Sequence, residues 1–299
     1  MPTTERRTTL DGLAVSLLLG CCVLWGLNQV ATKVALADFP PFTQAALRSA
    51  GAALLVLTWA RLRGIALFTR DGTLRGGLLA GALFALEFGL IFFGLQFTTA
   101  SRMVVFIYLA PFVVALGMPF VARSEKLKPL QFVGLAIAFG GVAAAFAEGF
   151  GQPTAGDRQW LGDACGVAAA LVWGATTLSI RSTRLASAAP EKTLLYQLGL
   201  SALLLGIAAP VAHETWPQQV AALSWGALLF QTVIVTFASY LVWFWLVRHY
   251  AATRIASFTL LTPISGLVAG ALVLNEPLTP RLLLALATVV LGLVLVNRK

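Results

Sequence analysis

Long, uninterrupted runs of apolar residues dominate this sequence and limit what the chain can fold into. Runs of about 20 residues match the roughly 30 Å hydrocarbon core of a bilayer at about 1.5 Å per residue. They are expected to be helical, because lipid offers the backbone no hydrogen-bond partner and the period-2 alternation of a membrane barrel is missing. We expect ten spans, over residues 13–36, 42–59, 74–95, 100–122, 130–147, 161–180, 193–212, 223–247, 252–274 and 282–296.

The composition agrees with a membrane protein and argues against a soluble one. Hydrophobic residues make up 59% of the chain and charged residues 11%, whereas a soluble domain carries about 25% charged residues. The connections between the expected spans are short and leave no room for a soluble domain. The predicted fold class is therefore all-α, a polytopic integral membrane protein with ten transmembrane helices.

The basic residues predict the orientation of these helices. The formal net charge is +9, but the basic residues are sorted by loop and do not form a nucleic-acid-binding face. Sixteen of them fall on the side that holds both termini, against three, Arg102, Arg158 and Arg281, on the other side. Because cytoplasmic loops are enriched in lysine and arginine, both termini are expected in the cytoplasm.

The first span has a competing interpretation as a cleaved signal peptide. Two arginines, an apolar stretch and Leu19-Gly20-Cys21 resemble a lipoprotein cleavage site. Against cleavage, the apolar segment continues to Leu36 and its later part recurs in the second half of the chain. The three cysteines, Cys21, Cys22 and Cys165, lie in apolar segments and predict neither a disulfide framework nor a metal site. No cofactor is expected.

The chain carries an internal duplication. Matching pieces recur in the same order roughly 150 residues apart. They are Leu24-Trp25-Gly26 with Val172-Trp173-Gly174, Ala100-Ser101-Arg102 with Ala252-Thr253-Arg254, Leu109-Ala110-Pro111 with Leu261-Thr262-Pro263, and Glu125 with Glu276. We expect two units, residues 1–149 and 150–299, of five spans each. Since five is odd, the second unit enters the membrane from the opposite side, and such inverted repeats are typical of secondary transporters.

These features resemble the drug/metabolite transporter superfamily, and within it the EamA-type exporters and the YddG-like amino-acid exporters. The resemblance rests on ten spans in two inverted repeats, Trp-Gly in spans one and six, and proline followed by glutamate in spans four and nine. It covers essentially the whole chain. It implies export of amino acids or related metabolites across a bacterial inner membrane by alternating access.

Polar residues on one face of the first span predict part of a substrate-binding cavity. Trp25, Asn28, Gln29 and Lys33 follow helical spacing. Polarity within lipid is costly and usually faces the interior of a bundle. The alternative is hydrogen bonding between helices without a role in binding. The matching face of the sixth span contributes Trp173 and Thr177, the repeat mates of Trp25 and Gln29.

Three charged residues within the spans have two interpretations each. Glu87, an acidic residue near the middle of a span, is expected to contact a substrate ammonium or carry a coupling proton, or else to pair with Arg48 structurally. Lys33 and Arg48 either snorkel to the headgroups or act as carboxylate or gate contacts.

Aromatic residues and prolines complete the candidate site. Tyr108 and Trp243 are expected to line the cavity, although most aromatic residues in membranes pack or anchor at interfaces. Pro111 and Pro263 lie near the middle of spans four and nine and are expected to act as hinges, or as fixed bends.

Several classes of function compete with an amino-acid exporter. A drug or metabolite exchanger or importer of the same fold would share these features. A membrane enzyme is disfavoured because no paired acidic motif is present and both histidines lie near span ends. A channel would not need an inverted duplication, and no Walker loop indicates ATP use. The expected partners are a small-molecule substrate and the lipid bilayer, and two repeats in one chain are compatible with a functional monomer.

Overall fold

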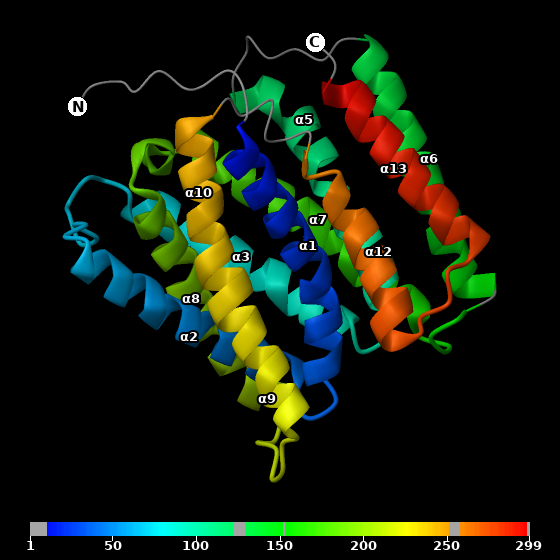
Figure 1. The fold of residues 1–299 in the computed structure, drawn as a ribbon, viewed down its shortest axis with the longest axis horizontal. Helices are drawn as coiled ribbons and strands as arrows, with labels where there is room; N and C mark the ends of the chain where they lie inside the picture. The colour runs from blue at the N-terminus through cyan, green and yellow to red at the C-terminus, as the bar shows by residue number, and fades with distance from the viewer. Residues whose placement is uncertain (1–10, 122–128, 152, 251–257, 298–299) are drawn as a thin grey trace.

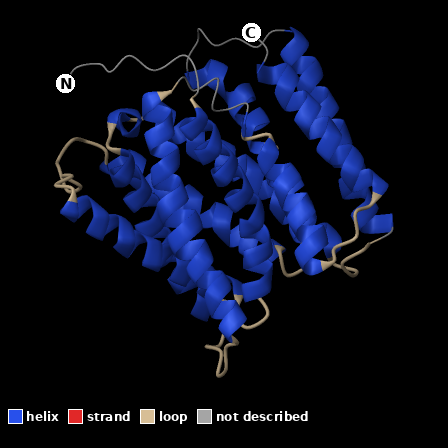
Figure 2. Ribbon diagram, viewed as in Figure 1, coloured by secondary structure: helices blue, strands red, loops and turns tan. Residues whose placement is uncertain are grey.

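The computed structural model describes residues 11–121, 129–151, 153–250 and 258–297, and these residues form helices and loops without a strand (Figure 2). Eight apolar helical segments of at least 18 residues are long enough to cross a membrane, counting only this part of the chain and taking Ala100–Val121 and Ala222–Leu246 each as one segment. Two shorter apolar stretches follow, Leu261–Leu274 and Pro280–Val296, the second within a helix that ends at Asn297. The all-α, multi-pass fold predicted from the sequence is therefore confirmed.

The helical elements follow the predicted spans closely. They are α1 (Gly12–Ala35), α2 (Pro41–Leu62), α3 (Leu74–Gly94), α4 (Ala100–Ile107), α5 (Ala110–Val121), α6 (Pro129–Gly151), α7 (Gln159–Ser182), η1 (Arg184–Ser187), α8 (Pro190–Val211), α9 (Ala222–Leu229), η2 (Phe230–Ser239), α10 (Tyr240–His249), α12 (Leu261–Leu274) and α13 (Pro280–Asn297).

Local sequence signals start several of these helices. The Asp11 side chain accepts a hydrogen bond from the Ala14 amide at the start of α1, and Thr99 does the same for Arg102 in α4. Proline occupies the first position of α2 and α8, where its missing N–H costs nothing because that group has no partner within the helix.

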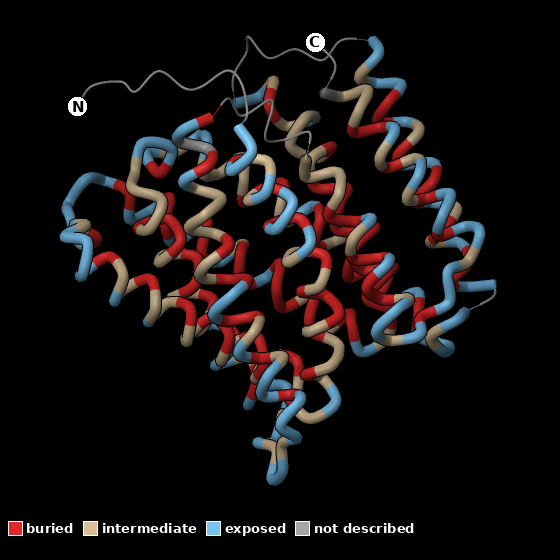
Figure 3. The backbone as a smooth tube through the Cα atoms, in the orientation of Figure 1, coloured by how far each residue is buried: buried red, intermediate tan, exposed pale blue. Residues whose placement is uncertain are grey.

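The helices form an elongated bundle in which α6 packs along α13 on one side and α2 packs along α8 on the other (Figure 1). Helices α1, α3, α7, α10 and α12 lie between these pairs. We call the end where α1 begins and α13 ends the terminal face, and the end where α1 ends and α13 begins the opposite face. Buried residues concentrate in the middle of the bundle and exposed ones on its outside (Figure 3).

The fourth span is broken rather than smoothly bent. Helix α4 ends at Ile107 and α5 begins at Ala110, so that Tyr108 and Leu109 lie in the break. Pro111 is the second residue of α5, where its missing N–H removes a bond that would otherwise join the two helices. Pro263 occupies the first turn of α12 in the same way. Residues 252–257 of the expected ninth span lie outside the described residues.

The eighth span contains an unusual helical segment. Its central part, η2, is a π-helix of 10 residues between α9 and α10. Such widened turns are rare and often occur at functional sites, because they rotate side chains away from the regular helical positions. Ser239 at the end of η2 and Tyr240 just beyond it both face α1, where they contact Trp25.

The repeated Trp-Gly pairs have a structural reason. A Cβ added to Gly26 would lie 2.5 Å from the Gly266 amide nitrogen of α12, and one added to Gly174 would lie 2.5 Å from Val113 Cγ1 of α5. Glycine thus lets α1 approach α12 and lets α7 approach α5. The neighbouring tryptophans make contacts of their own: Trp25 lies against Trp243, and Trp173 lies against Tyr108.

Candidate functional site

Buried polar side chains lie on α1, α2 and α3, in the half of the bundle nearer the opposite face, where η2 packs against both α1 and α2 and where α2 packs against α3. We call Asn28, Gln29, Gln44, Arg48 and Glu87 the central polar group. Their exposed fractions lie between 0% for Gln44 and 6% for Asn28. Polar groups buried in lipid or protein need partners, so atoms here that lack one are informative.

Arg48 is held by aromatic rings rather than by an anion. Its guanidinium carbon lies 3.8 Å from the centroid of the Phe88 ring and 5.2 Å from that of Phe92, both on α3. Its Nε and Nη2 atoms are buried and have no hydrogen-bond partner among the described residues. The side chain is 1% exposed, so the expectation that Arg48 snorkels to the headgroups is wrong.

Glu87 lies next to Phe88 on α3 and is also buried. Its Oε2 atom has no hydrogen-bond partner, and none of the ion pairs formed by the described residues joins Glu87 to Arg48. The structural pair considered as an alternative is therefore not formed. The Phe88 ring that contacts the Arg48 guanidinium belongs to the residue next to Glu87 on α3, so the two charged side chains come from neighbouring positions of α2 and α3.

The amide side chains add further oxygen atoms without partners. Asn28 Oδ1, Gln29 Oε1 and Gln44 Oε1 are buried and unpaired within the part of the chain that is described. The neighbouring groups are satisfied: Thr32 Oγ1 donates to Gln231 Oε1 over 3.0 Å, and Gln44 Nε2 donates to the Thr32 carbonyl over 3.3 Å. These bonds tie α1, α2 and η2 together beside the unpaired oxygens.

Aromatic side chains border the central polar group on α1 and α10. Trp25 Nε1 donates to Ser239 Oγ over 2.8 Å. The Trp25 ring lies edge-on to Tyr240 at 6.2 Å and to Trp243 at 5.1 Å between centroids. Trp25 lies one helical turn before Asn28 and Gln29 on α1, so these rings adjoin the amide side chains of the central polar group.

A second aromatic pair comes from the break in the fourth span and from α7. Tyr108 and Trp173 meet edge-on, with ring centroids 6.1 Å apart. Thr177, the repeat mate of Gln29, donates its hydroxyl to the Trp173 carbonyl one turn earlier in its own helix.

Lys33 lies apart from this group. Its ammonium donates to the carbonyls of Leu95, over 3.1 Å, and of Thr98. These carbonyls follow the end of α3, where unpaired carbonyls and the helix dipole favour a cation. In this structure Lys33 therefore caps α3 at the opposite face, whereas Arg48 belongs to the central polar group.

A buried ionic network near the opposite face was missed from the sequence. Arg102 Nη1 bonds Glu148 Oε2 at 2.8 Å and Arg102 Nη2 bonds Asp163 Oδ2 at 2.7 Å. The hydroxyls of Thr98 and Thr279 donate to the same two carboxylates. From the sequence, Arg102 was assigned to a loop on the outer side. The positions of Arg102, Glu148 and Asp163 close to the ends of three spans were the signal that could have indicated an ionic network.

Three further carboxylates at the opposite face cap helices of the other half of the chain. Glu276 accepts the amides of Ala100 and Ser101, at the start of α4, over 2.7 and 2.8 Å. Glu214 accepts two amides at the start of α2. Asp38 accepts the Ala221 amide and the Ser224 hydroxyl at the start of α9, and these bonds lower the pKa of Asp38. The two halves are therefore joined closely at this face.

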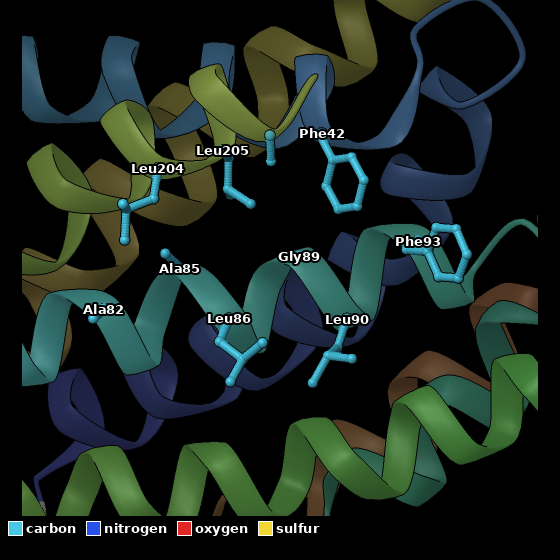
Figure 4. Close-up of a pocket in the computed structure, with 10 residues that line it drawn as sticks. Phe42, Ala82, Ala85, Leu86, Gly89, Leu90, Phe93, Leu204 and Leu205 are labelled. Atoms are coloured by element: carbon cyan, nitrogen blue, oxygen red, sulfur yellow. The ribbon is translucent and has the colours of Figure 1, made fainter. Parts of the chain in front are cut away.

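A groove of about 360 Å³ lies elsewhere, between α3 and α8 (Figure 4). It is lined by Phe42, Ala85, Gly89, Phe93 and Leu205 among others, and polar side chains are missing from its walls. Its position on the apolar outside of the bundle suits contact with lipid chains, because nothing in it selects a polar solute. It is separate from the central polar group.

Comparison with known proteins identifies the chain's relatives. The model of the EamA-like transporter family matches residues 12–147 and again residues 160–298. The chain is 30% identical over 292 residues to the uncharacterized transporter YvbV of Bacillus subtilis, covering 95% of this chain and 91% of that protein. It is 28% identical over 293 residues to a probable amino-acid metabolite efflux pump of Escherichia coli, covering 95% and 93%.

A solved crystal structure has the same fold. It superposes with a TM-score of 0.65 at 20% sequence identity and covers 95% of this chain and 97% of that one. The family match spans most of the sequence, in two parts that coincide with its two halves. The chain is a membrane transporter and belongs to the EamA-like transporter family of the drug/metabolite transporter superfamily.

Proposed function

We propose that this protein is a secondary transporter that exports amino acids, including neutral and aromatic ones, or related small metabolites. The observation that carries the proposal is the central polar group, in which buried polar atoms without partners lie beside tryptophan and tyrosine rings. A transporter needs such atoms, because the polar groups of a substrate lose their hydrogen bonds to water inside the protein and must form new ones with it.

The proposal assigns the predicted residues to a central cavity between the two repeats, residues 1–149 and 150–299. Asn28, Gln29 and Glu87 supply polar contacts. Trp25, Tyr108, Trp173, Thr177 and Trp243 supply the walls. The aromatic rings suit an apolar substrate side chain, because flat rings bury a large area and stack against one another.

Alternating access would open this cavity to each side of the membrane in turn. The breaks beside Pro111 and Pro263 are the proposed hinges, since the helix there lacks regular hydrogen bonds. In our proposal the terminal face lies in the cytoplasm of a bacterium, in agreement with the distribution of basic residues, and a single chain with both repeats is the working unit.

Export rather than import is supported by the relatives in Escherichia coli and Salmonella typhimurium, both of which carry the name probable amino-acid metabolite efflux pump. An exchanger or importer of drugs or metabolites is the second candidate, because the same architecture serves either direction. The direction of net flux is set by the gradients and by coupling rather than by the fold.

The test is transport by purified protein in proteoliposomes. A panel of radiolabelled amino acids is offered at several pH values and with gradients in both directions, with protein-free liposomes as the control. We expect saturable uptake of several amino acids that is competed by unlabelled substrate. No uptake of any amino acid under any of these conditions would refute the amino-acid assignment and direct the search to drugs and other metabolites.

A further inference from the structure

We propose that Arg48 and Glu87 form a two-charge binding site that recognises a zwitterion, with Arg48 binding a carboxylate and Glu87 an ammonium on the same substrate. This inference rests on the proposed function and narrows its substrate class. It predicts that the transporter distinguishes an α-amino acid from the amine and from the 2-oxo acid that share its side chain.

Arg48 provides a preformed site for an anion. Stacking on Phe88 and Phe92 fixes the plane of the guanidinium group, and Nε and Nη2 remain as donors without partners. Arginine stays charged in proteins and binds carboxylates through two parallel hydrogen bonds. A substrate carboxylate that accepts from Nε and Nη2 would satisfy both nitrogen atoms at once.

Glu87 provides the opposite charge nearby. Its carboxylate is buried in α3, one residue before the ring that holds Arg48, and Oε2 has no partner. A buried carboxylate without a partner is costly, and an ammonium group is a partner that donates up to three hydrogen bonds. None of the ion pairs within the described part of the chain joins Glu87 to Arg48, and both side chains keep buried atoms without partners, so each group is open to a ligand.

The ionic network around Arg102 shows how a second buried arginine of this protein is paired. There the same protein surrounds a buried arginine with two carboxylates and a backbone carbonyl, so that its charge is fully compensated. Arg48, equally buried, receives no such partners among the described residues. Where most buried polar atoms of a protein have hydrogen-bond partners, a small group of them without partners is typical of a functional site.

The charge count then selects the ligand. A substrate ammonium would favour the ionised form of Glu87, and the ionised Glu87 and Arg48 together carry no net charge, so a zwitterion compensates both without adding any. A 2-oxo acid would leave Glu87 without a partner, and an amine would leave Arg48 without one. Sites that bond a polar group of the substrate reject analogues lacking it strongly, because the site is then left with a buried unpaired group.

The experiment compares three competitors in the proteoliposome assay. Uptake of the best-transported labelled amino acid is measured at pH 6 against its unlabelled form, its decarboxylated amine and its 2-oxo acid; for phenylalanine these are 2-phenylethylamine and phenylpyruvate. We expect the amine and the oxo acid to compete at least about 100-fold more weakly than the amino acid. Competition by either analogue within about 10-fold of the amino acid overturns the proposal.

Two variants test which residue binds the carboxylate of the substrate and which binds its ammonium group. In Arg48→Met we expect the amine to bind as well as the amino acid, and in Glu87→Gln the oxo acid to bind as well as the amino acid. Ligand binding is followed as thermal stabilisation of the purified protein, so that loss of transport does not hide it. Arg61→Met, an exposed change on the same helix, is the matched control and should keep the wild-type preference. A variant that keeps the full preference overturns the assignment of its charge.

This outcome can be separated from failure of the proposed function. If no amino acid is transported, the proposed function fails. If amino acids are transported but an analogue competes equally well in the wild-type protein, transport stands and the two-charge site is wrong. The wild-type comparison requires no variant to fold and therefore decides the question by itself.

Discussion

Replacing Arg102 with methionine removes the cation from the ionic network near the opposite face, and we expect a large loss of stability. Arg102 bonds Glu148 at 2.8 Å and Asp163 at 2.7 Å, and all three side chains are at least 94% buried. Removing one partner of a buried ion pair costs about 3–5 kcal/mol, because the other charge stays buried without compensation. Here two carboxylates are left behind, which places the expected cost at the upper end of that range.

The same substitution at Arg48 is expected to behave differently. Arg48 is as buried as Arg102, at 1% exposure for each, but it has no anionic partner among the described residues. Its removal abolishes the cost of burying an unpaired charge, and it also removes a stacking interaction with Phe88 worth on the order of 2 kcal/mol. Methionine fills most of the same volume, so the two contributions leave a net change near zero.

Thermal unfolding of the two purified variants in one detergent measures the contrast. The apparent Tm of Arg102→Met should fall by on the order of 10 °C, whereas that of Arg48→Met should stay within about 3 °C of the wild type. Arg61→Met controls for the loss of a basic residue as such. If Arg48→Met lost as much stability as Arg102→Met, Arg48 would be a structural residue and the reasoning behind the binding site would be refuted.

Three further predictions concern packing, charge and gating. Gly26→Ala should lower the Tm by several degrees, since its Cβ would meet backbone of α12 at 2.5 Å, whereas Gly20→Ala, with nothing within 4 Å, should leave the Tm unchanged. The Lys192 ammonium lowers the pKa of Asp71 in the loop before α3. That contact stabilises the fold fully above the unfolded pKa of about 4 and is lost as the pH falls from there through the lower folded-state pKa, so the difference in Tm between wild type and Asp71→Asn should be largest at pH 7 and shrink progressively below about pH 4. Pro111→Ala should slow transport severalfold without changing substrate preference if the break is a hinge; an unchanged rate would favour a fixed bend.

Much of the fold could be predicted because lipid leaves the chain few choices. Apolar length and charge count were enough to place the spans, and the helices of the structure begin and end within a few residues of them, except at the start of the ninth span, where residues 252–257 lie outside the described residues and α12 begins at Leu261. The break at Tyr108 and the π-helical segment η2 could not be predicted in the same way. Both depend on the local pattern of backbone hydrogen bonds, which the hydropathy of the side chains does not report.

Part of the central polar group could be found from the sequence, although its role in binding substrate stays a prediction. Helical spacing brought Trp25, Asn28 and Gln29 to one face, and intramembrane charge singled out Glu87. Helical spacing says nothing about which helices touch, so the burial of Gln44 beside α1 was missed. Burial of Arg48 was also missed, because the aromatic rings that hold it come from α3, about 40 residues away in the sequence.

The ionic network around Arg102 was missed for a related reason. Its three charges lie near the ends of separate spans, where charged residues ordinarily face headgroups or water. Only the packing of α4 against α7, together with the bonds from Arg102 to α6, shows that these ends are covered. Charges at span ends therefore need the tertiary structure before they can be assigned to solvent or to the interior.

The central claim is that substrate binds at Arg48 of the central polar group, and counterflow tests it most directly. Proteoliposomes loaded with an unlabelled amino acid are diluted into a trace of the labelled form, with wild-type protein, Arg48→Met and Arg61→Met compared at equal amounts of folded protein. We predict accumulation of label by the wild type and by Arg61→Met and none by Arg48→Met. Counterflow by Arg48→Met at the wild-type rate would contradict the account.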